Sequence, residues 1–536
     1  MAVRKSRFGA PLWVWLIRWI SLLLAVGLVF SIPWPQDPLL PPDLYFHLDP
    51  LISLALILST WVIPSIVTLA LVTLAVTLIF GRVFCGYICP LGIWLDISGV
   101  RKGSKSRKQL PLRWRYLFLL VFLIAALLGF PLPYLFDPQG IFYRSLSLAI
   151  VPLGGKVLAQ GANWLQGWSV FPTSGAEGFF GWLHRLAQSP SGLRFYYLGV
   201  VAASMFVGIT LLERLASRFW CRFLCPLGAL LSLFSRFSLL KRKVDEVKCN
   251  SCLACQRACP MGAIGEGGKP TDLSLCFNCK ECKQKCPTAS ISFKWSFPRP
   301  TSASALDLSR RAALGSLGIA VIGAAGARLS LHAFSRVDII RPPGAIPEEK
   351  FLGTCVGCMR CAEVCPTNII VPTDLRCGLT SLFTPRLDFI RQGCASDCAA
   401  CGYACPSNAL LKLELEEKIY HKLGTAMVNR GRCLAWSQSQ VCLVCKESCP
   451  FGAIASRSRD GMFGQILVPA VERARCVGCG TCEANCPVRG RTAIAVQSDG
   501  EDRASGTFPP SEKVIKIRTR RRNKPIEDDP PPGIGS

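Results

Sequence analysis

The sequence has little histidine and few acidic side chains. Only 4 histidines occur in 536 residues, and none follows a C-x-x-C pair, so the attachment motif of c-type haem is absent. The same scarcity argues against a membrane haem held by histidine pairs. No glycine-rich dinucleotide fingerprint follows a strand-like run, so we expect no NAD. Charged residues make up 18%, below the usual quarter or so of a soluble protein, which argues against an ordinary cytosolic enzyme.

Apolar residues, basic residues and cysteines are abundant instead. Hydrophobic residues make up 50% of the chain, the formal net charge is +27 and there are 29 cysteines. The mean hydropathy is +0.35. Disulfide-rich secreted proteins are short, so that class fits this length badly. The composition indicates a basic membrane protein of roughly three or four domains with many metal-binding thiolates.

Four apolar runs have the length of membrane helices. They are Trp13–Phe30, a stretch within Leu51–Phe80, Tyr116–Phe130 continued to Phe136, and Phe195–Leu212. A helix needs about 20 mostly apolar residues to cross a bilayer. The second run is longer, so Pro64 indicates a kink or a lead-in segment. The alternative is a set of buried helices in a large soluble protein, but the charged flanks favour a membrane α-helical bundle.

Basic residues flank these runs unevenly. Three Lys or Arg lie in Met1–Arg7, seven in Arg101–Arg115 and seven in Arg214–Lys243, whereas Phe30–Pro50 has none. By the positive-inside rule, the N-terminus and the exits of the second and fourth spans are cytoplasmic. The first run has no small-residue cleavage site before Pro33 and further spans follow, so we interpret it as an anchor.

A fifth apolar stretch, Ala312–Leu331, follows Arg310-Arg311. The string Leu308–Leu314 is similar to a twin-arginine export signal inside the chain, although a chance arginine pair is the alternative. We therefore expect four spans plus this fifth. The tail after Ser498 is Pro-rich and polar and is predicted to be disordered. Its basic run between Lys513 and Lys524 favours contact with solvent or lipid headgroups over nucleic acid.

An eleven-residue pattern occurs twice, each time after an even-numbered span. Arg82–Gly92 and Arg218–Gly228 both read R-x-x-C-x-x-x-C-P-L-G. A second, weaker repeat is an Asp-Pro pair that lies a few residues beyond a Pro-x-Pro. It occurs as Asp37-Pro38 and as Asp137-Pro138. The membrane part therefore consists of two parallel repeats. The repeat supplies four symmetric cysteines on the cytoplasmic side: Cys85, Cys89, Cys221 and Cys225.

These four membrane cysteines have several interpretations. The C-x3-C spacing places each pair on one helical face, and four such thiols suit a further Fe–S site. Redox-active thiol pairs and inert, helix-breaking elements are the alternatives. Arg82 and Arg218 either lower the thiol pKa or face lipid headgroups, and the second role is slightly favoured.

Two bacterial ferredoxin motifs follow the last span. They are Cys249, Cys252, Cys255 and Cys259-Pro260, then Cys276, Cys279, Cys282 and Cys286-Pro287. In this C-x2-C-x2-C-x3-C-P run the fourth cysteine ligates the other cluster. Cys286 therefore joins the first three cysteines at one [4Fe–4S] cluster, and Cys259 joins the second three. Zinc also binds thiolates, but the paired run is far more specific for iron–sulfur.

Four more motifs occupy the C-terminal half, and they predict six [4Fe–4S] clusters in all. Their cysteines are Cys355, Cys358, Cys361 and Cys365; Cys394, Cys398, Cys401 and Cys405; Cys433, Cys442, Cys445 and Cys449; and Cys476, Cys479, Cys482 and Cys486. Only Cys377 is left over, and it suits a plain buried thiol. The predicted domains are a helical domain (1–243), a two-cluster α+β ferredoxin (244–296), a linker (297–345), a four-cluster ferredoxin (346–497) and the tail (498–536).

The motifs resemble two known families joined in one chain. Residues 1–295 resemble NapH-type membrane quinol dehydrogenase subunits, and residues 308–497 resemble NapG or MauM-type ferredoxins. In the wider four-cluster family the first motif shares ligands with the fourth, and the second with the third. The resemblance thus implies Cys486 with the Cys355 motif, Cys365 with the Cys476 motif, Cys449 with the Cys394 motif and Cys405 with the Cys433 motif. The second motif departs from the family spacing, so Cys377 could replace its first ligand.

The resulting hypothesis is electron transfer between the membrane quinol pool and a redox partner protein. The resemblance implies a quinol dehydrogenase module in a bacterial inner membrane, serving a cytochrome or a periplasmic reductase such as nitrate reductase. The first ferredoxin would be cytoplasmic and the second periplasmic. Asp37, Asp137 and His47 are candidate proton acceptors, although solvated loop positions are favoured for them. The alternatives are a redox sensor, a maturation factor and a metal-ion reductase.

Overall fold

The computed structural model describes residues 10–30, 41, 43–61, 67–98, 113–130, 132–167, 197–296, 315, 317–318, 321–323, 338–461, 464–488 and 490–503. Asp37, Pro64, the arginine pair Arg310-Arg311, most of Ala312–Leu331 and the basic tail lie outside these residues. The predictions made for those segments therefore stay predictions.

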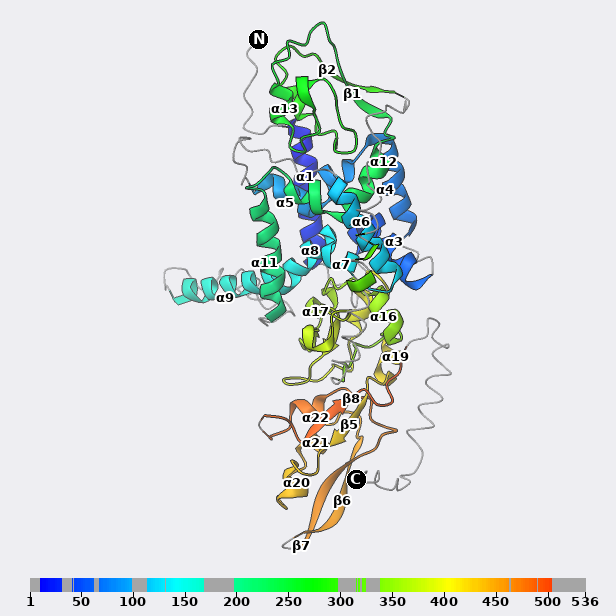
Figure 1. Ribbon diagram of the computed structural model, residues 1–536. Coiled ribbons are helices and arrows are strands. Elements are labelled where there is room, and N and C mark those ends of the chain that lie inside the picture. Colours follow the sequence, from blue (N-terminus) through cyan, green and yellow to red (C-terminus); the bar gives the residue numbers. More distant parts are fainter. Residues whose placement is uncertain are drawn as a thin grey trace.

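A helical bundle forms the middle of the molecule, with an iron–sulfur-type unit at each end (Figure 1). Its helices are α1 (Leu12–Phe30), α2 (Leu44–His47), α3 (Pro50–Thr60), α4 (Val67–Phe80), α5 (Pro90–Ile97), α6 (Arg113–Leu127), α7 (Leu132–Phe136), α8 (Pro138–Ser145), α9 (Val151–Gly167), α11 (Tyr197–Leu212) and α12 (Pro226–Ser235). Three π-helical turns interrupt them: η1 (Phe84–Ile88), η2 (Leu146–Ile150) and η3 (Trp220–Leu224).

The apolar runs form shorter helices than the sequence suggested. Among the described residues, one helix segment, Leu12–Val29, is long and apolar enough by length and composition to cross a membrane. The run Leu51–Phe80 contains two helices, α3 and α4, and Pro64 lies between them, outside the described residues. The αL conformation of Trp61 (φ 56°) ends α3. Helices α4, α6 and α11 have 14, 15 and 16 residues.

The first ferredoxin unit lies at the end of the bundle reached by α4 and α12 (Figure 1). It contains β1 (Leu240–Val244), α13 (Ala254–Ala258), the 3-10 turn η4 (Glu266–Gly268), α14 (Glu281–Gln284) and β2 (Ile291–Trp295). β1 and β2 pair antiparallel from Leu240↔Trp295 to Val244↔Ile291. This ladder closes the unit by joining the segment before the first motif to the segment after the second. The boundary we placed after residue 243 cuts through β1.

The second ferredoxin part lies at the opposite end and is elongated (Figure 1). Its helices are α16 (Glu348–Thr354), α17 (Arg360–Glu363), α18 (Ala400–Tyr403), α19 (Leu415–Tyr420), α20 (Leu434–Ser437), α21 (Val444–Glu447) and α22 (Thr481–Ala484), with a 3-10 turn η6 (Leu375–Cys377). Its strands form three antiparallel pairs: β3 (Ile370–Pro372) with β4 (Pro385–Leu387), β5 (Thr425–Val428) with β8 (Ile494–Gln497), and β6 (Ile454–Gly461) with β7 (Gly464–Val471).

Hydrogen bonds attach both ferredoxin parts to the bundle. On one side the Asn278 amide donates to Phe80 O, and Tyr87 Oη donates to Asn278 O at 2.9 Å. On the other side, Ser59 Oγ and Tyr134 Oη both donate to Gly353 O, at 2.9 and 3.0 Å. Both contacts lie within two residues of a motif cysteine, so they fix the cysteine loops relative to the bundle.

Candidate iron-sulfur centres

The outer site of the first ferredoxin is lined by the predicted four thiols. Cys249, Cys252, Cys255 and Cys286 surround one cavity of about 310 Å³. The loop turns sharply because Ser251 and Leu253 adopt positive φ angles of 52° and 58°. Cys286 comes from the second motif, so the cysteines are grouped as the predicted exchange of the fourth ligand requires, while the ligation itself stays a prediction.

The inner site gathers Cys259 with Cys276, Cys279 and Cys282. Burial raises the pKa of Cys276 to about 12, and the thiols of Cys259 and Cys282 add to this rise. Burial likewise raises the pKa of Cys282 to about 11, with Cys259 nearby. Buried thiols that crowd one another give up their protons when a cation binds, which suits an iron–sulfur group. Both sites of this unit therefore have the grouping of cysteines that the predicted exchange of ligands requires.

The C-terminal cysteines form four sets, and their pairing differs from the one implied by the family resemblance. Cys405 joins the first motif. Burial raises the pKa of the Cys355 thiol to about 12, and the neighbouring Cys405 thiol is the second cause of this rise. Cys365 joins the second motif, Cys486 the third and Cys449 the fourth, in cavities of about 330, 350 and 320 Å³. Motifs one and two therefore share ligands, as do motifs three and four. The implied pairing of one with four and two with three is wrong.

The β ladders give the physical reason for this pairing. An Ala345↔Leu410 bridge closes the unit of motifs one and two. The pair β5–β8, from Thr425↔Gln497 to Val428↔Ile494, closes the unit of motifs three and four. Each closure joins the segments before and after two neighbouring motifs, as β1–β2 does in the first ferredoxin. Such a closure brings consecutive motifs face to face and keeps the first motif away from the fourth.

The four C-terminal sets lie in one row that begins at the bundle. Cys361 of the first set has Cys401 of the second among its neighbouring thiols. Cys394 N donates to Cys479 O at 2.7 Å, which joins the second set to the Cys476 set. Cys482 in turn has Cys445 nearby, so the Cys433 set is outermost. The row therefore does not follow the order of the motifs in the sequence.

Cys377 is not part of any set. It is buried in η6, and the groups that affect its thiol are Arg386, Asp374 and Arg341. The second set has its four cysteines without it, so Cys377 is a plain buried thiol and not a substitute ligand.

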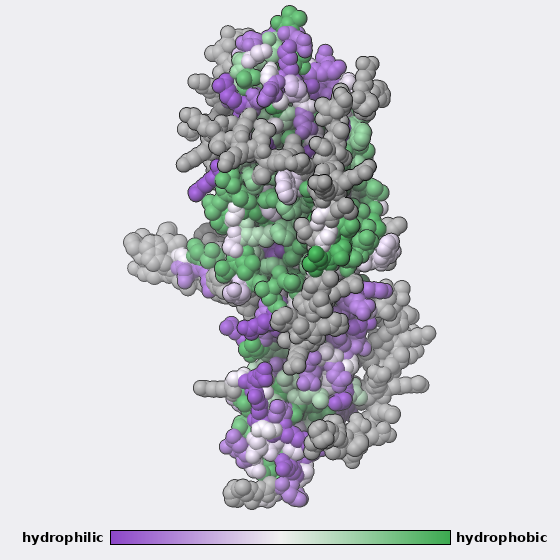
Figure 2. Space-filling view, in the orientation of Figure 1, coloured by the Kyte–Doolittle hydropathy of each residue, from purple (hydrophilic) through white to green (hydrophobic). Residues whose placement is uncertain are grey.

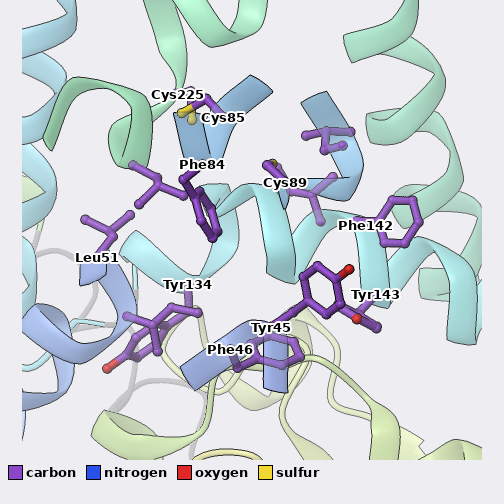
Figure 3. Close-up of a cluster of buried hydrophobic side chains, with 14 of the residues drawn as sticks. Tyr45, Phe46, Leu51, Phe84, Cys85, Cys89, Tyr134, Phe142, Tyr143 and Cys225 are labelled. Atoms are coloured by element: carbon purple, nitrogen blue, oxygen red, sulfur yellow. The ribbon is translucent and has the colours of Figure 1, made fainter. Parts of the chain in front are cut away.

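The four bundle cysteines all lie in the core, and Figure 3 shows Cys85, Cys89 and Cys225 among its side chains. Cys85, Cys89, Cys221 and Cys225 are all buried in one hydrophobic cluster. Each first cysteine lies in a π-helical turn, and each second cysteine is the extended residue before a proline that begins α5 or α12. The expectation that each pair shares one helical face is wrong, because the helix breaks at the second cysteine. Within the described residues, no three Cys, His, Asp or Glu side chains are placed to share one metal ion. An Fe–S site at these four cysteines stays a prediction.

Arg82 and Arg218 do not face lipid headgroups. They are 1% and 0% exposed. Arg82 Nη2 donates to Cys221 O at 3.3 Å, and Arg218 Nη1 donates to Cys85 O at 2.9 Å. Each arginine thus binds the first cysteine of the other repeat, which fixes the two motifs against each other.

A buried carboxylate balances two of the buried arginines. Arg218 Nη2 lies 2.6 Å and Arg18 Nη1 3.2 Å from Asp96 Oδ2. Arg18 is the one charged residue within α1, and this ion pair explains why an arginine interrupts the first apolar run. Burying charges is tolerated only where they are paired.

The structure describes two of the three candidate proton acceptors, Asp137 and His47. Asp137 is 0% exposed and accepts a hydrogen bond from Gly140 N at 2.8 Å, so it is not a solvated loop residue. His47 is partly exposed and pairs with Asp43 at 3.0 Å. The partner of Asp137 is Asp49, which the sequence reasoning missed. Both aspartates precede a proline at the start of a helix, and this shared Asp-Pro pattern is the signal that could have identified the pair.

Comparisons with known proteins agree with the cysteine chemistry. Models described as a 4Fe-4S binding domain match residues 62–108 and 196–245, and also 242–265. A 4Fe-4S dicluster domain model matches residues 272–369, which include the linker. This match covers the Cys276 motif of the first ferredoxin and the Cys355 motif of the second, which belong to different units in the structure. The ferredoxin-type protein MauM of Paracoccus denitrificans is 33% identical over 189 residues, which are 34% of this chain and 81% of MauM.

Two ferredoxin-type proteins from Escherichia coli have similar sequence identity to this chain. NapG is 32% identical over 179 residues, which are 32% of this chain and 75% of NapG. NapF is 33% identical over 156 residues, 29% of this chain and 84% of NapF. The chain belongs to the MauM/NapG family of ferredoxin-type proteins. No solved structure matches it. Several [4Fe–4S] clusters and an electron-transfer role follow from this membership and from the cysteine sets.

Proposed function

We propose that this ferredoxin-type protein is a membrane-bound quinol dehydrogenase component that passes electrons from quinol to a redox partner. The observation that carries the proposal is the placement of cysteine sets at both ends of an apolar bundle, with four more cysteines between them. When bound, a [4Fe–4S] cluster accepts and releases one electron. Quinol is apolar and reaches a protein only from the bilayer, so the bundle is the place where it would react.

The surface of the bundle supports a membrane location. Figure 2 shows hydrophobic side chains gathered over the middle of the molecule, with polar side chains towards both ends. Ile20, Leu71 and Val200 are 64%, 58% and 63% exposed on three different helices. Large exposed apolar surfaces mark protein or membrane contacts. We propose that α1, α4, α6 and α11 span the membrane as the four spans predicted from the sequence. The predicted fifth span, Ala312–Leu331, lies mostly outside the described residues and stays a prediction.

The distribution of basic residues supports the sidedness. α4 ends and α6 begins at the end of the bundle that carries the first ferredoxin, and Arg115 Nη2 donates to Ser274 Oγ of that unit at 2.7 Å. The seven Lys and Arg of Arg101–Arg115 precede or begin α6. By the positive-inside rule this end is cytoplasmic. The C-terminal ferredoxin then lies on the periplasmic side of a bacterial inner membrane, where its outermost Cys433 set would be nearest a partner.

The outermost set has a surface that a partner could contact. Val441 is 88% exposed beside Cys442. Arg430 and Arg459 stack on Trp436 in the same region, with their guanidinium carbons 4.4 and 5.2 Å from the ring. Exposed aromatic and arginine side chains are common in protein interfaces. We propose that a cytochrome or a reductase docks here.

Stopped-flow spectroscopy tests the proposal. The purified, cluster-loaded protein in lipid vesicles is mixed with a quinol analogue, and cluster bleaching is followed, with dithionite as the control reductant. We expect both reductants to bleach the clusters. Bleaching by dithionite alone would reject quinol oxidation and favour a redox sensor, a maturation factor or a metal-ion reductase. A periplasm-only reporter fused after Ser498 tests the sidedness, since it would be inactive if that end were cytoplasmic.

A further inference from the structure

Two aspartates are buried against each other at the first turns of α3 and α8. Asp49 and Asp137 are both 0% exposed. Asp49 Oδ1 accepts from Leu51 N at 2.8 Å, and Asp137 Oδ2 accepts from Gly140 N at 2.8 Å. Each carboxyl thus uses one oxygen to cap a helix. Among the described residues, Asp49 Oδ2 and Asp137 Oδ1 have no donor while both groups are ionised.

The charges around the pair favour one bound proton. Arg144 is the cation near Asp137, and Cys89 is a neighbouring thiol. The Arg144 guanidinium is not paired with either carboxylate: its Nε donates to Gly357 O at 2.8 Å, and its Nη2 donates to Tyr134 O at 3.1 Å. Two carboxylates beside one buried cation leave an excess negative charge, which a single proton neutralises. Burial accordingly raises the pKa of both carboxyls, and the negative charge of Asp137 adds to the rise at Asp49.

The pair lies between two of the cysteine sites. Asp137 begins α8, whose eight residues are all buried. Arg144, at the far end of α8, binds the backbone between Cys355 and Cys358 through Gly357. Figure 3 shows Tyr45 and Tyr143 between Cys89 and the ribbon of the C-terminal ferredoxin. Tyr143 Oη and both side-chain polar atoms of Gln139 also have no partner among the described residues. Unsatisfied buried polar groups mark places where water or a ligand is expected.

We infer that Asp49 and Asp137 share one proton and together accept the protons released when quinol is oxidised near α8. This inference rests on the proposed function. Oxidation of one quinol to quinone releases two electrons and two protons. Two [4Fe–4S] clusters, held by the cysteine sets, would each accept one of these electrons. The pair, which holds one proton, binds a second proton, releases one to water and then repeats the cycle.

The test uses Asp49→Asn and Asp137→Asn in the full, cluster-loaded protein. Asparagine also caps helices, so the folds of α3 and α8 are kept. Asp43→Asn is the matched control, because Asp43 is a partly exposed carboxylate on the same side of the bundle. The first readout is the infrared carbonyl band of a protonated carboxyl at neutral pH, which shifts in heavy water. We expect this band in the wild type and in Asp43→Asn, and its loss in each of the two other variants.

The second readout is the rate of cluster reduction by quinol compared with dithionite. General acid–base groups contribute about 100-fold or more to rates, so we expect a loss of that order with quinol and no change with dithionite. Wild-type quinol rates in both variants, or no protonated-carboxyl band in the wild type, would overturn the inference. If quinol fails to reduce even the wild type, the proposed function is rejected and the acceptor role with it, while the infrared band still decides whether the proton is shared.

Discussion

The ring of Phe277 lies directly against the backbone of Gly86. A Cβ added to Gly86 would lie 2.2 Å from Phe277 Cδ2. Phe277 follows Cys276 of the inner ferredoxin site, and Gly86 follows Cys85 of the bundle site. This contact therefore joins the two groups of cysteines, and it explains why the first repeat has glycine after its cysteine.

We expect Gly86→Ala to push Phe277 out of its place and to destabilise the junction by about 1–3 kcal/mol, as overpacking does. Thermal unfolding and protease sensitivity of residues 240–296 would measure this. Gly208→Ala is the matched control, because a Cβ at Gly208 meets nothing within 4 Å. Adding Phe277→Ala to Gly86→Ala removes the clash. If the double variant is no more resistant to protease than Gly86→Ala, the contact is not the cause.

Cys405→Ala and Cys486→Ala distinguish the two pairings of the C-terminal motifs. We expect Cys405→Ala to damage the cluster held by Cys355, Cys358 and Cys361, because Cys405 lies in that set. Cys486→Ala should instead damage the Cys433 site. Electron paramagnetic resonance and iron analysis, against about 24 iron atoms for six intact [4Fe–4S] clusters, would identify the lost site. Damage to the Cys355 site by Cys486→Ala would contradict the pairing.

Asp96→Asn should be strongly destabilising. Asp96 is the shared partner of Arg18 and Arg218, all three with fully buried side chains. Removing its charge leaves two buried cations without compensation, which costs about 3–5 kcal/mol. Asp245→Asn is the control, because its ion pair with Lys248 is exposed and such pairs contribute about 1 kcal/mol or less. Equal midpoints of thermal unfolding for the two variants would show that the buried pair is not needed.

The stability of the bundle should depend on pH through Asp137. Burial raises the pKa of Asp137 from 3.8 to about 6. The folded protein then binds this proton more tightly than the unfolded chain, so the contribution of Asp137 to stability falls as pH rises from about 4 to 6 and does not change above that range. Two pKa units correspond to about 3 kcal/mol. Unfolding of the wild type and Asp137→Asn across this range measures the difference, and parallel curves would refute the shift.

The sequence by itself determined the ligand chemistry. Three closely spaced cysteines occur in every motif except the third C-terminal one, where Cys433 lies further upstream, so the spacing alone predicts iron–sulfur sites. The exchange of Cys259 and Cys286 could be predicted as well, because the first ferredoxin has only two motifs to pair. The repeat of Arg82–Gly92 as Arg218–Gly228 also showed that the bundle has two related halves, since each half must place its cysteines in the same way.

Only the tertiary structure decided which distant groups meet. All four C-terminal motifs end in the same C-x2-C-x3-C-P pattern, so nothing in that spacing distinguishes Cys405 from Cys486 as the partner of Cys355. The ladders between residues far apart in the chain make that choice. The same holds for Asp49, which looks like an ordinary helix cap until α3 and α8 pack and bury it against Asp137. Arg82 and Arg218 likewise contact backbone carbonyl oxygens of the opposite repeat, because packing brings the two motifs together around both buried guanidiniums.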